Sequence, residues 1–120
     1  GNLGGDQLVK FEPGAVIAPG ITSVAAFGHT PGHTLFRMDS EGQSFAYVAD
    51  ITNVPSLFAR APDWSVLFDM NPVMARMSRR RVFDMLVKDK MMAGGFHFPF
   101  PAFGTMEASG NGYQFKPVAA

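Results

Sequence analysis

The sequence predicts an α+β fold in which a mixed sheet carries a helix packed on one face. Two observations lead to this prediction. Short apolar or β-branched runs recur between Gly- and Pro-containing turns, and one amphipathic helical pattern lies between two of those runs. A strand, a helix and a second strand in this order are typical of a crossover onto a layered α/β or α+β sheet. With 120 residues, of which 47% are hydrophobic, the chain can bury one modest core, so we expect one domain.

The first ten residues are expected to lie outside the folded domain. Residues 1–10, rich in Gly at their start, are predicted to be a scar or a disordered edge, so that the domain covers residues 11–120. Residues 11–17 mix apolar residues with a Pro-Gly pair, which indicates a short strand pair or a turn. Residues 21–27 are apolar and β-branched and predict a strand that ends at Gly28.

The middle of the chain is predicted to form a hairpin and a short helix. Residues 34–38 and 45–49 read as strands, and the turn chemistry of residues 39–42 joins them. The second of these strands is nearly continuous in apolar character, so we expect both of its faces to be buried. Residues 56–61 predict one or two helical turns, and residues 64–68 a short extended segment.

The clearest helix follows, with Asp69 or Asn71 as its cap and Pro72 in its first turn. One face gathers the helix's core candidates: Met74, Ala75, Ser78, Val82, Met85 and Leu86. Four arginines lie to the sides and back of that face: Arg76, Arg79, Arg80 and Arg81. We expect them to form a solvated helix face. A phosphate or nucleic-acid site is the weaker alternative, because the net charge of the chain is zero.

After the helix, residues 91–94 predict a short buried strand. Residues 105–108 and 113–116 alternate between apolar and polar types, with a Gly-containing turn between them, and predict a terminal hairpin.

Composition excludes several classes of function. Ten Lys and Arg balance ten Asp and Glu, which does not favour a nucleic-acid or membrane-surface partner. The chain has no Cys, which excludes disulfides and thiolate metal sites, and no apolar run approaches the roughly 20 residues of a membrane span. Eight Met and twelve Phe suit an adaptable core, or else a surface that a second chain covers.

The residues that can carry chemistry are three histidines and one aspartate. His29 and His33 lie in the segment Gly-His-Thr-Pro-Gly-His, Asp50 follows an apolar strand, and His97 follows another. Ligands and catalytic groups favour such strand ends, and imidazole nitrogen with carboxylate oxygen suits zinc, iron or manganese. The residues alone leave a second interpretation open, in which each His is a structural residue beside aromatic side chains and Asp50 is a cap or turn former.

In this order, the Gly-His-Thr-Pro-Gly-His segment, Asp50 and His97 resemble the metallo-β-lactamase superfamily, in particular its methyl parathion hydrolase and acyl-homoserine lactonase-like branch. The resemblance covers about residues 11–118. It implies a metal-dependent hydrolase of esters, lactones or phosphotriesters with a dinuclear site. It also implies that His33, Asp50 and His97 are metal ligands. His29 and Thr30 would be supporting residues beside them.

The sequence departs from that family in one large respect. The family's upstream His-x-His-x-Asp-His motif is absent, so the chain resembles the C-terminal half of an αββα sandwich. With His33, Asp50 and His97 alone, about two protein ligands would remain for each metal. We therefore expect weak or absent binding of zinc, manganese or iron, and no hydrolysis by this chain alone.

An unpaired half-sandwich should expose an apolar sheet face, which predicts a homodimer. Because the upstream motif is absent, the alternative function is a non-catalytic interaction or structural domain that forms a homodimer. A third alternative is a small metal-binding module that two copies complete together.

Overall fold

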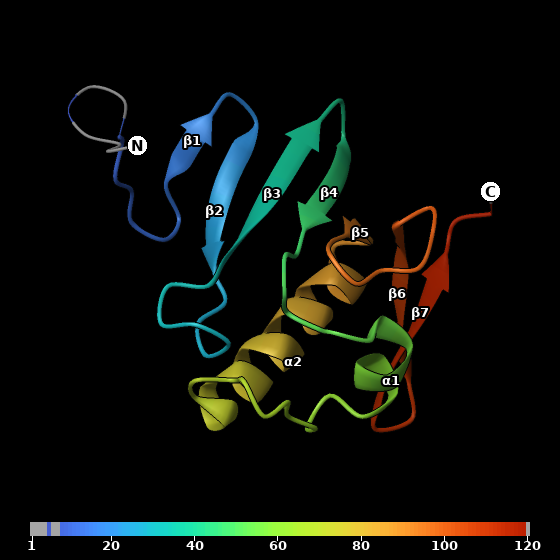
Figure 1. The fold of residues 1–120 in the computed structure, drawn as a ribbon. Coiled ribbons are helices and arrows are strands. Elements are labelled where there is room, and N and C mark those ends of the chain that lie inside the picture. The colour runs from blue at the N-terminus through green and yellow to red at the C-terminus, as the bar shows by residue number, and fades with distance from the viewer. Residues whose placement is uncertain (1–4, 6–7, 120) are drawn as a thin grey trace.

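The computed structural model describes residue 5 and residues 8–119, and shows one seven-stranded sheet with two helices (Figure 1). Part of the predicted N-terminal edge, residues 1–4 and 6–7, and residue 120 lie outside the described residues. The strands are β1 (Val16–Ala18), β2 (Ile21–Ala25), β3 (Thr34–Ser40), β4 (Gln43–Tyr47), β5 (Met92–Gly94), β6 (Phe103–Ser109) and β7 (Gly112–Pro117). The helices are α1 (Pro55–Arg60) and α2 (Pro72–Lys88).

The strands lie in the sheet in their sequence order, and every neighbouring pair is antiparallel except β4 and β5. The parallel pair is joined through α1 and α2, because a parallel connection must carry the chain back to the starting edge. The predicted α+β fold with a mixed sheet is therefore confirmed. None of the helices in the described part of the chain is both long enough and apolar enough to cross a membrane.

The β3–β4 hairpin is tighter than predicted. The strands continue to Ser40 and from Gln43, so only Glu41 and Gly42 form the turn. Both have positive φ, 51° and 77°, which matches the right-handed twist of a two-residue hairpin and explains the glycine.

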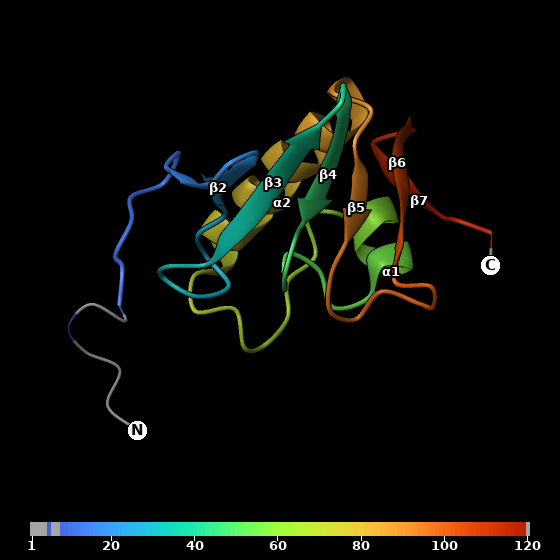
Figure 2. The ribbon, with the colours of Figure 1, turned by 90° about the horizontal axis from the view of Figure 1, so that it is seen from above.

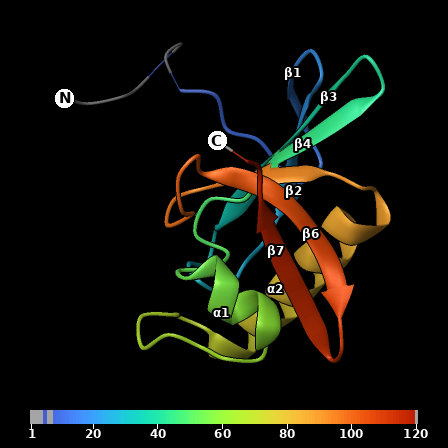
Figure 3. The same ribbon diagram turned by 90° about the vertical axis from the view of Figure 1, so that its right-hand side faces the viewer.

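Helix α2 covers one face of the sheet, as Figure 2 shows. Its buried apolar residues are Ala75, Val82, Phe83 and Leu86. Val82, Phe83 and Leu86 form one cluster with residues of the sheet and its strand ends that point toward the same face: Leu35, Ala46, Val48, Ala93 and Met106. The β6–β7 hairpin curves around this core beside α1 (Figure 3), and Phe83 meets Tyr113 edge to face at 5.3 Å between ring centroids.

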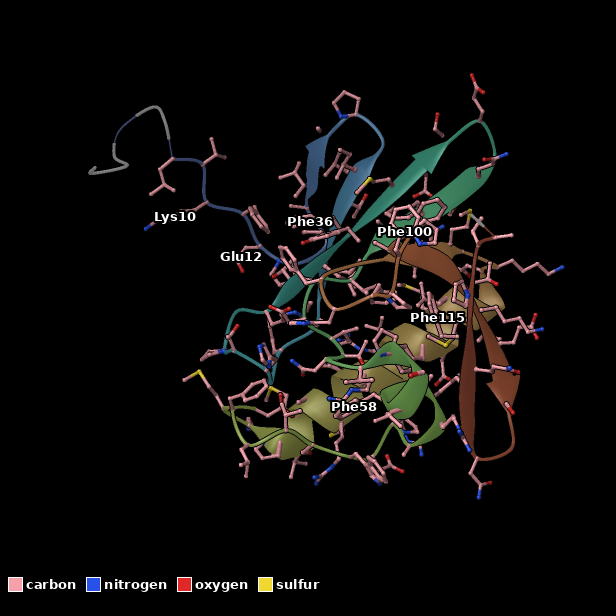
Figure 4. The ribbon with its side chains drawn as sticks, turned by 45° about the vertical axis from the view of Figure 1, so that its right-hand side comes forward. Lys10, Glu12, Phe36, Phe58, Phe100 and Phe115 are labelled. Atoms are coloured by element: carbon pink, nitrogen blue, oxygen red, sulfur yellow. The ribbon has the colours of Figure 1, made fainter. Side chains whose placement is uncertain are left out.

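The opposite face of the sheet carries apolar side chains that are only half-buried: Phe36, Met38, Phe45, Tyr47 and Met92 (Figure 4 labels Phe36). We call these five residues the open sheet face. The prediction that the strand of residues 45–49 is buried on both faces is therefore wrong. Ala46 and Val48 face the α2 side and are fully buried, whereas Phe45 and Tyr47 alternate to the face that α2 does not cover.

Two other predictions need correction. Residues 64–68, predicted as a short extended segment, have no regular structure at residues 64–66 and form a turn at residues 67–68. The arginines of α2 are not one solvated face either: Arg79 is 2% exposed, and Met74, predicted for the core, is 43% exposed. Arg79 faces the segments before and after α1, where the backbone carbonyls of Ile51 and Pro62 accept hydrogen bonds from its guanidinium.

Candidate functional site

The loop between β2 and β3 holds the Gly-His-Thr-Pro-Gly-His segment against the start of α2. The backbone amide of Asn71 donates to the carbonyl oxygen of Gly28 at 2.8 Å, and Asn71 then caps α2 by accepting from the amide of Met74 at 3.0 Å. Gly28 has a φ of 129°, and a Cβ there would lie 2.1 Å from the backbone nitrogen of Ala75. Only glycine therefore allows this close approach.

His33 is buried at the end of this loop, and both of its ring nitrogens have partners. Nδ1 donates to the carbonyl oxygen of Ala26 at 2.9 Å, and Nε2 accepts from the backbone amide of Asp50 at 3.1 Å. A carbonyl is an acceptor only and an amide is a donor only, so these partners select the Nδ1–H tautomer. Burial is the main cause that lowers the pKa of His33 below its ordinary value.

Asp50 and His97 meet at the edge of the sheet where β4 and β5 end. Because these two strands are parallel, their carboxyl ends lie at the same edge, and the residues that follow them are brought together. The Nε2 atom of His97 is 3.2 Å from Oδ1 of Asp50, and both side chains are partly exposed. Both histidines thus contact Asp50: His33 contacts its backbone amide, and His97 contacts its carboxylate.

The predicted supporting residues behave differently from each other. The Thr30 side chain is exposed, and its contribution is the carbonyl oxygen, which accepts from the amides of Gly28 and His33 at 3.0 and 3.3 Å. His29 lies beside His33, with 5.7 Å between ring centroids and the rings nearly perpendicular. Its Nδ1 is 3.0 Å from Oδ1 of Asp69.

Two residues of this region were missed by sequence reasoning. Asp69 was considered as a helix cap, but its buried carboxylate binds His29 while Asn71 caps α2. Arg79 was placed among solvated arginines, but its guanidinium donates to the carbonyl oxygens of Ile51 and Pro62, each at 2.8 Å. No local pattern in the sequence indicated these contacts, because the partners lie 17 to 40 residues away along the chain.

The donor types fit a divalent metal, but their number does not. Imidazole nitrogens and a carboxylate are suitable ligands for zinc, manganese or iron. Within residue 5 and residues 8–119, however, no three His, Cys, Asp or Glu side chains converge as a metal-binding group. Asp50 and His97 offer one close pair, and the Nε2 lone pair of His33 is already engaged by the Asp50 amide.

Comparisons with known proteins agree on the fold. No protein-family model matches the chain, and no curated protein matches it. Among solved structures, AidC, a dizinc quorum-quenching lactonase, is 25% identical with a TM-score of 0.85, over 92% of this chain and 37% of that protein. The hydrolase AbOPH of the beta-lactamase superfamily is 26% identical with a TM-score of 0.81, over 86% of this chain and 36% of that protein.

A probable metal-dependent hydrolase from Staphylococcus aureus is 19% identical with a TM-score of 0.73, over 96% of this chain and 42% of that protein. This third likeness concerns the fold alone. The chain thus spans between a third and a half of the length of these three solved proteins.

Proposed function

We propose that this chain, whose fold is that of the metallo-β-lactamase superfamily hydrolases, is the C-terminal half of a metal-dependent hydrolase domain. In this proposal His33, Asp50 and His97 are its contribution to the metal site. The observation that carries the proposal is that both histidines contact Asp50: His97 faces its carboxylate, and His33 accepts a hydrogen bond from its backbone amide. One of the similar solved proteins is a lactonase, which supports lactones as a substrate class, while esters and phosphotriesters are proposed from the sequence resemblance alone.

The chain alone falls short of a complete metal site, so the proposal includes an inactive isolated chain. A divalent metal needs a full set of ligands before it can polarise a substrate or lower the pKa of bound water. Donors from outside this chain would have to supply the rest. We therefore expect weak binding of zinc and no turnover of lactone or phosphotriester substrates by the chain in isolation.

A zinc titration followed by NMR tests where this weak binding occurs. We expect the shift changes to centre on Asp50 and His97, and we expect Asp50→Asn to abolish them. Asp39→Asn is the matched control, because Asp39 is an exposed carboxylate on the β3–β4 hairpin that pairs with Arg37. Zinc-induced changes that avoid Asp50 and His97, or that Asp39→Asn removes equally, would contradict the proposal.

A second candidate function is a non-catalytic domain that forms a homodimer. It is favoured by the open sheet face, where Phe36 and Tyr47 are direct cross-strand partners and Tyr47 also meets Phe96 at 5.9 Å between ring centroids. Half-buried aromatic side chains on an uncovered sheet gain free energy when a second apolar surface removes them from water.

Light scattering at micromolar concentration tests this candidate. A dimer that Phe36→Glu converts to a monomer would support it, provided that Leu67→Glu, on the exposed 64–68 loop, leaves the mass unchanged. This candidate also predicts that His33→Ala and His97→Ala leave the mass unchanged. A monomeric chain with cooperative unfolding would refute it.

A further inference from the structure

A buried Asp–Arg pair lies behind the candidate site and supports His29. The side chain of Asp69 is 2% exposed, and that of Arg79 is 3% exposed. Oδ1 of Asp69 faces Nδ1 of His29 at 3.0 Å. Its Oδ2 accepts from the backbone amide of Val66 at 3.2 Å and lies 3.9 Å from Nη2 of Arg79.

Arg79 also links Asp69 to the backbone beside Asp50. Its Nε donates to the carbonyl oxygen of Ile51, the residue after Asp50, and its Nη1 donates to the carbonyl oxygen of Pro62. The guanidinium carbon also lies 4.7 Å from the centroid of the Phe58 ring (Figure 4 labels Phe58). One buried cation therefore holds the backbone beside Asp50 and the carboxylate that orients His29.

The contacts of Asp69 determine the tautomer of His29. A carboxylate only accepts hydrogen bonds, so the ring nitrogen that faces it must carry the proton. Nδ1 is that nitrogen, which leaves a lone pair on Nε2, on the other side of the ring from Asp69. The same logic already sets the Nδ1–H tautomer of the neighbouring His33.

We propose that Asp69 and Arg79 are positioning residues that hold His29 beside His33 as its Nδ1–H tautomer, so that the Nε2 lone pair accepts a hydrogen bond from a water or substrate O–H or N–H group. This inference rests on the proposed function, because it assigns His29 to the rim of that site. The geometry itself concerns the free chain and requires no metal.

Asp69→Asn tests the proposal because it changes hydrogen-bonding polarity without changing shape. Two donors, the Val66 amide and the Arg79 guanidinium, face the Oδ2 position, so the new amide must place its oxygen there. Its NH₂ group then faces Nδ1 of His29, which must become an acceptor and move its proton to Nε2. A buried carboxylate that selects a His tautomer in this way has a precedent in the Ser-His-Asp triad.

Long-range ¹H–¹⁵N spectra of the metal-free chain at pH 8 report the tautomer directly. We expect His29 to be Nδ1–H in the wild type and Nε2–H in Asp69→Asn. Asp63→Asn is the matched control. Asp63 is an acid of the same loop, but it is exposed and pairs with Arg80 instead, so the His29 tautomer should not change.

Carbethoxylation by diethyl pyrocarbonate reports whether the lone pair is accessible, since the reagent attacks an imidazole nitrogen that carries no proton. We expect His29 to react in the wild type and about tenfold more slowly in Asp69→Asn, which corresponds to ~1.4 kcal/mol in tautomer preference. The exposed ring of His97 is the internal reference.

Several outcomes would overturn the proposal: a wild-type Nε2–H ring, an unreactive wild-type His29, or a tautomer that Asp69→Asn leaves unchanged or that Asp63→Asn also changes. If Asp69→Asn does not fold, the two wild-type measurements still decide. A chain with the expected His29 tautomer but no zinc response at Asp50 would refute the proposed function and leave this inference standing.

Discussion

Replacement of Arg79 by Met should strongly destabilise the fold, although Arg79 belongs to a run of arginines that looks solvent-exposed in the sequence. Met keeps the length and the apolar stem of the side chain but removes every donor. The carbonyl oxygens of Ile51 and Pro62 then lose their partner inside the protein, and the buried carboxylate of Asp69 loses its only nearby cation in the described residues.

The magnitude follows from these groups. Each buried acceptor left without a partner costs about 1–3 kcal/mol, and removing the guanidinium recovers part of the cost of its own burial. We expect a net loss of about 3–5 kcal/mol, the range measured when one partner of a buried ion pair is removed. Against a typical unfolding free energy of about 5–15 kcal/mol, such a loss should be visible as a large shift of the unfolding midpoint.

Urea unfolding followed by circular dichroism measures this difference. Arg80→Met is the control, because Arg80 is the next residue of the same helix and its ion pair with Asp63 is exposed. Exposed ion pairs contribute little, so the control should move the midpoint only slightly. An Arg79→Met midpoint no lower than that of Arg80→Met would show that the buried network does not carry the assigned role.

Three further predictions concern the loop, the buried histidine and the core. Gly28→Ala should destabilise the fold by about 3 kcal/mol or more in thermal unfolding, because its φ of 129° and its contact with Ala75 leave no room for a Cβ. Gly32→Ala is the control and should be nearly neutral in the same assay, because a Cβ there would meet no atom within 4 Å. Burial lowers the pKa of His33, so the unfolded chain binds more protons, and the unfolding free energy should fall as the pH drops below the ordinary His value of 6.5. His33→Gln should flatten that slope in urea titrations at pH 5 and pH 8, and an unchanged slope would contradict this. Phe83→Ala should cost about 3–5 kcal/mol in the same titration, because its ring is fully buried in the core, and a loss below 1 kcal/mol would mean that the core repacks around the cavity.

Local patterns in the sequence were sufficient to place most elements. The strands β2, β3, β4 and β5 lie within a few residues of their predictions, because alternation and turn residues act over short distances. Helix α2 begins at Pro72 with Asn71 as its cap, one of the two caps that the sequence offered. Residues 64–68 were predicted as a short extended segment, and within the described residues they belong to none of the seven strands.

The side-chain environment of α2 was less predictable, because a helical pattern does not determine which face meets the core. Arg79 and Arg80 are adjacent and chemically identical, yet one is buried and the other pairs with a surface carboxylate. The difference comes from the loop after α1, whose backbone carbonyls point at one position and not at the next. Asp69 was likewise assigned to a cap, because its partner His29 lies 40 residues away in the sequence.

The sequence by itself determined the secondary structure, the mixed α+β architecture and the residue types of a candidate metal centre, because helix caps, turns and strand alternation depend on neighbours in the chain. It also placed Asp50 and His97 after strands. Only the tertiary structure decided that these two side chains meet, since their distance depends on the parallel pairing of β4 and β5. It alone decided that Asp69 and Arg79 are buried behind His29, because burial and hydrogen bonding there depend on segments that only folding brings together.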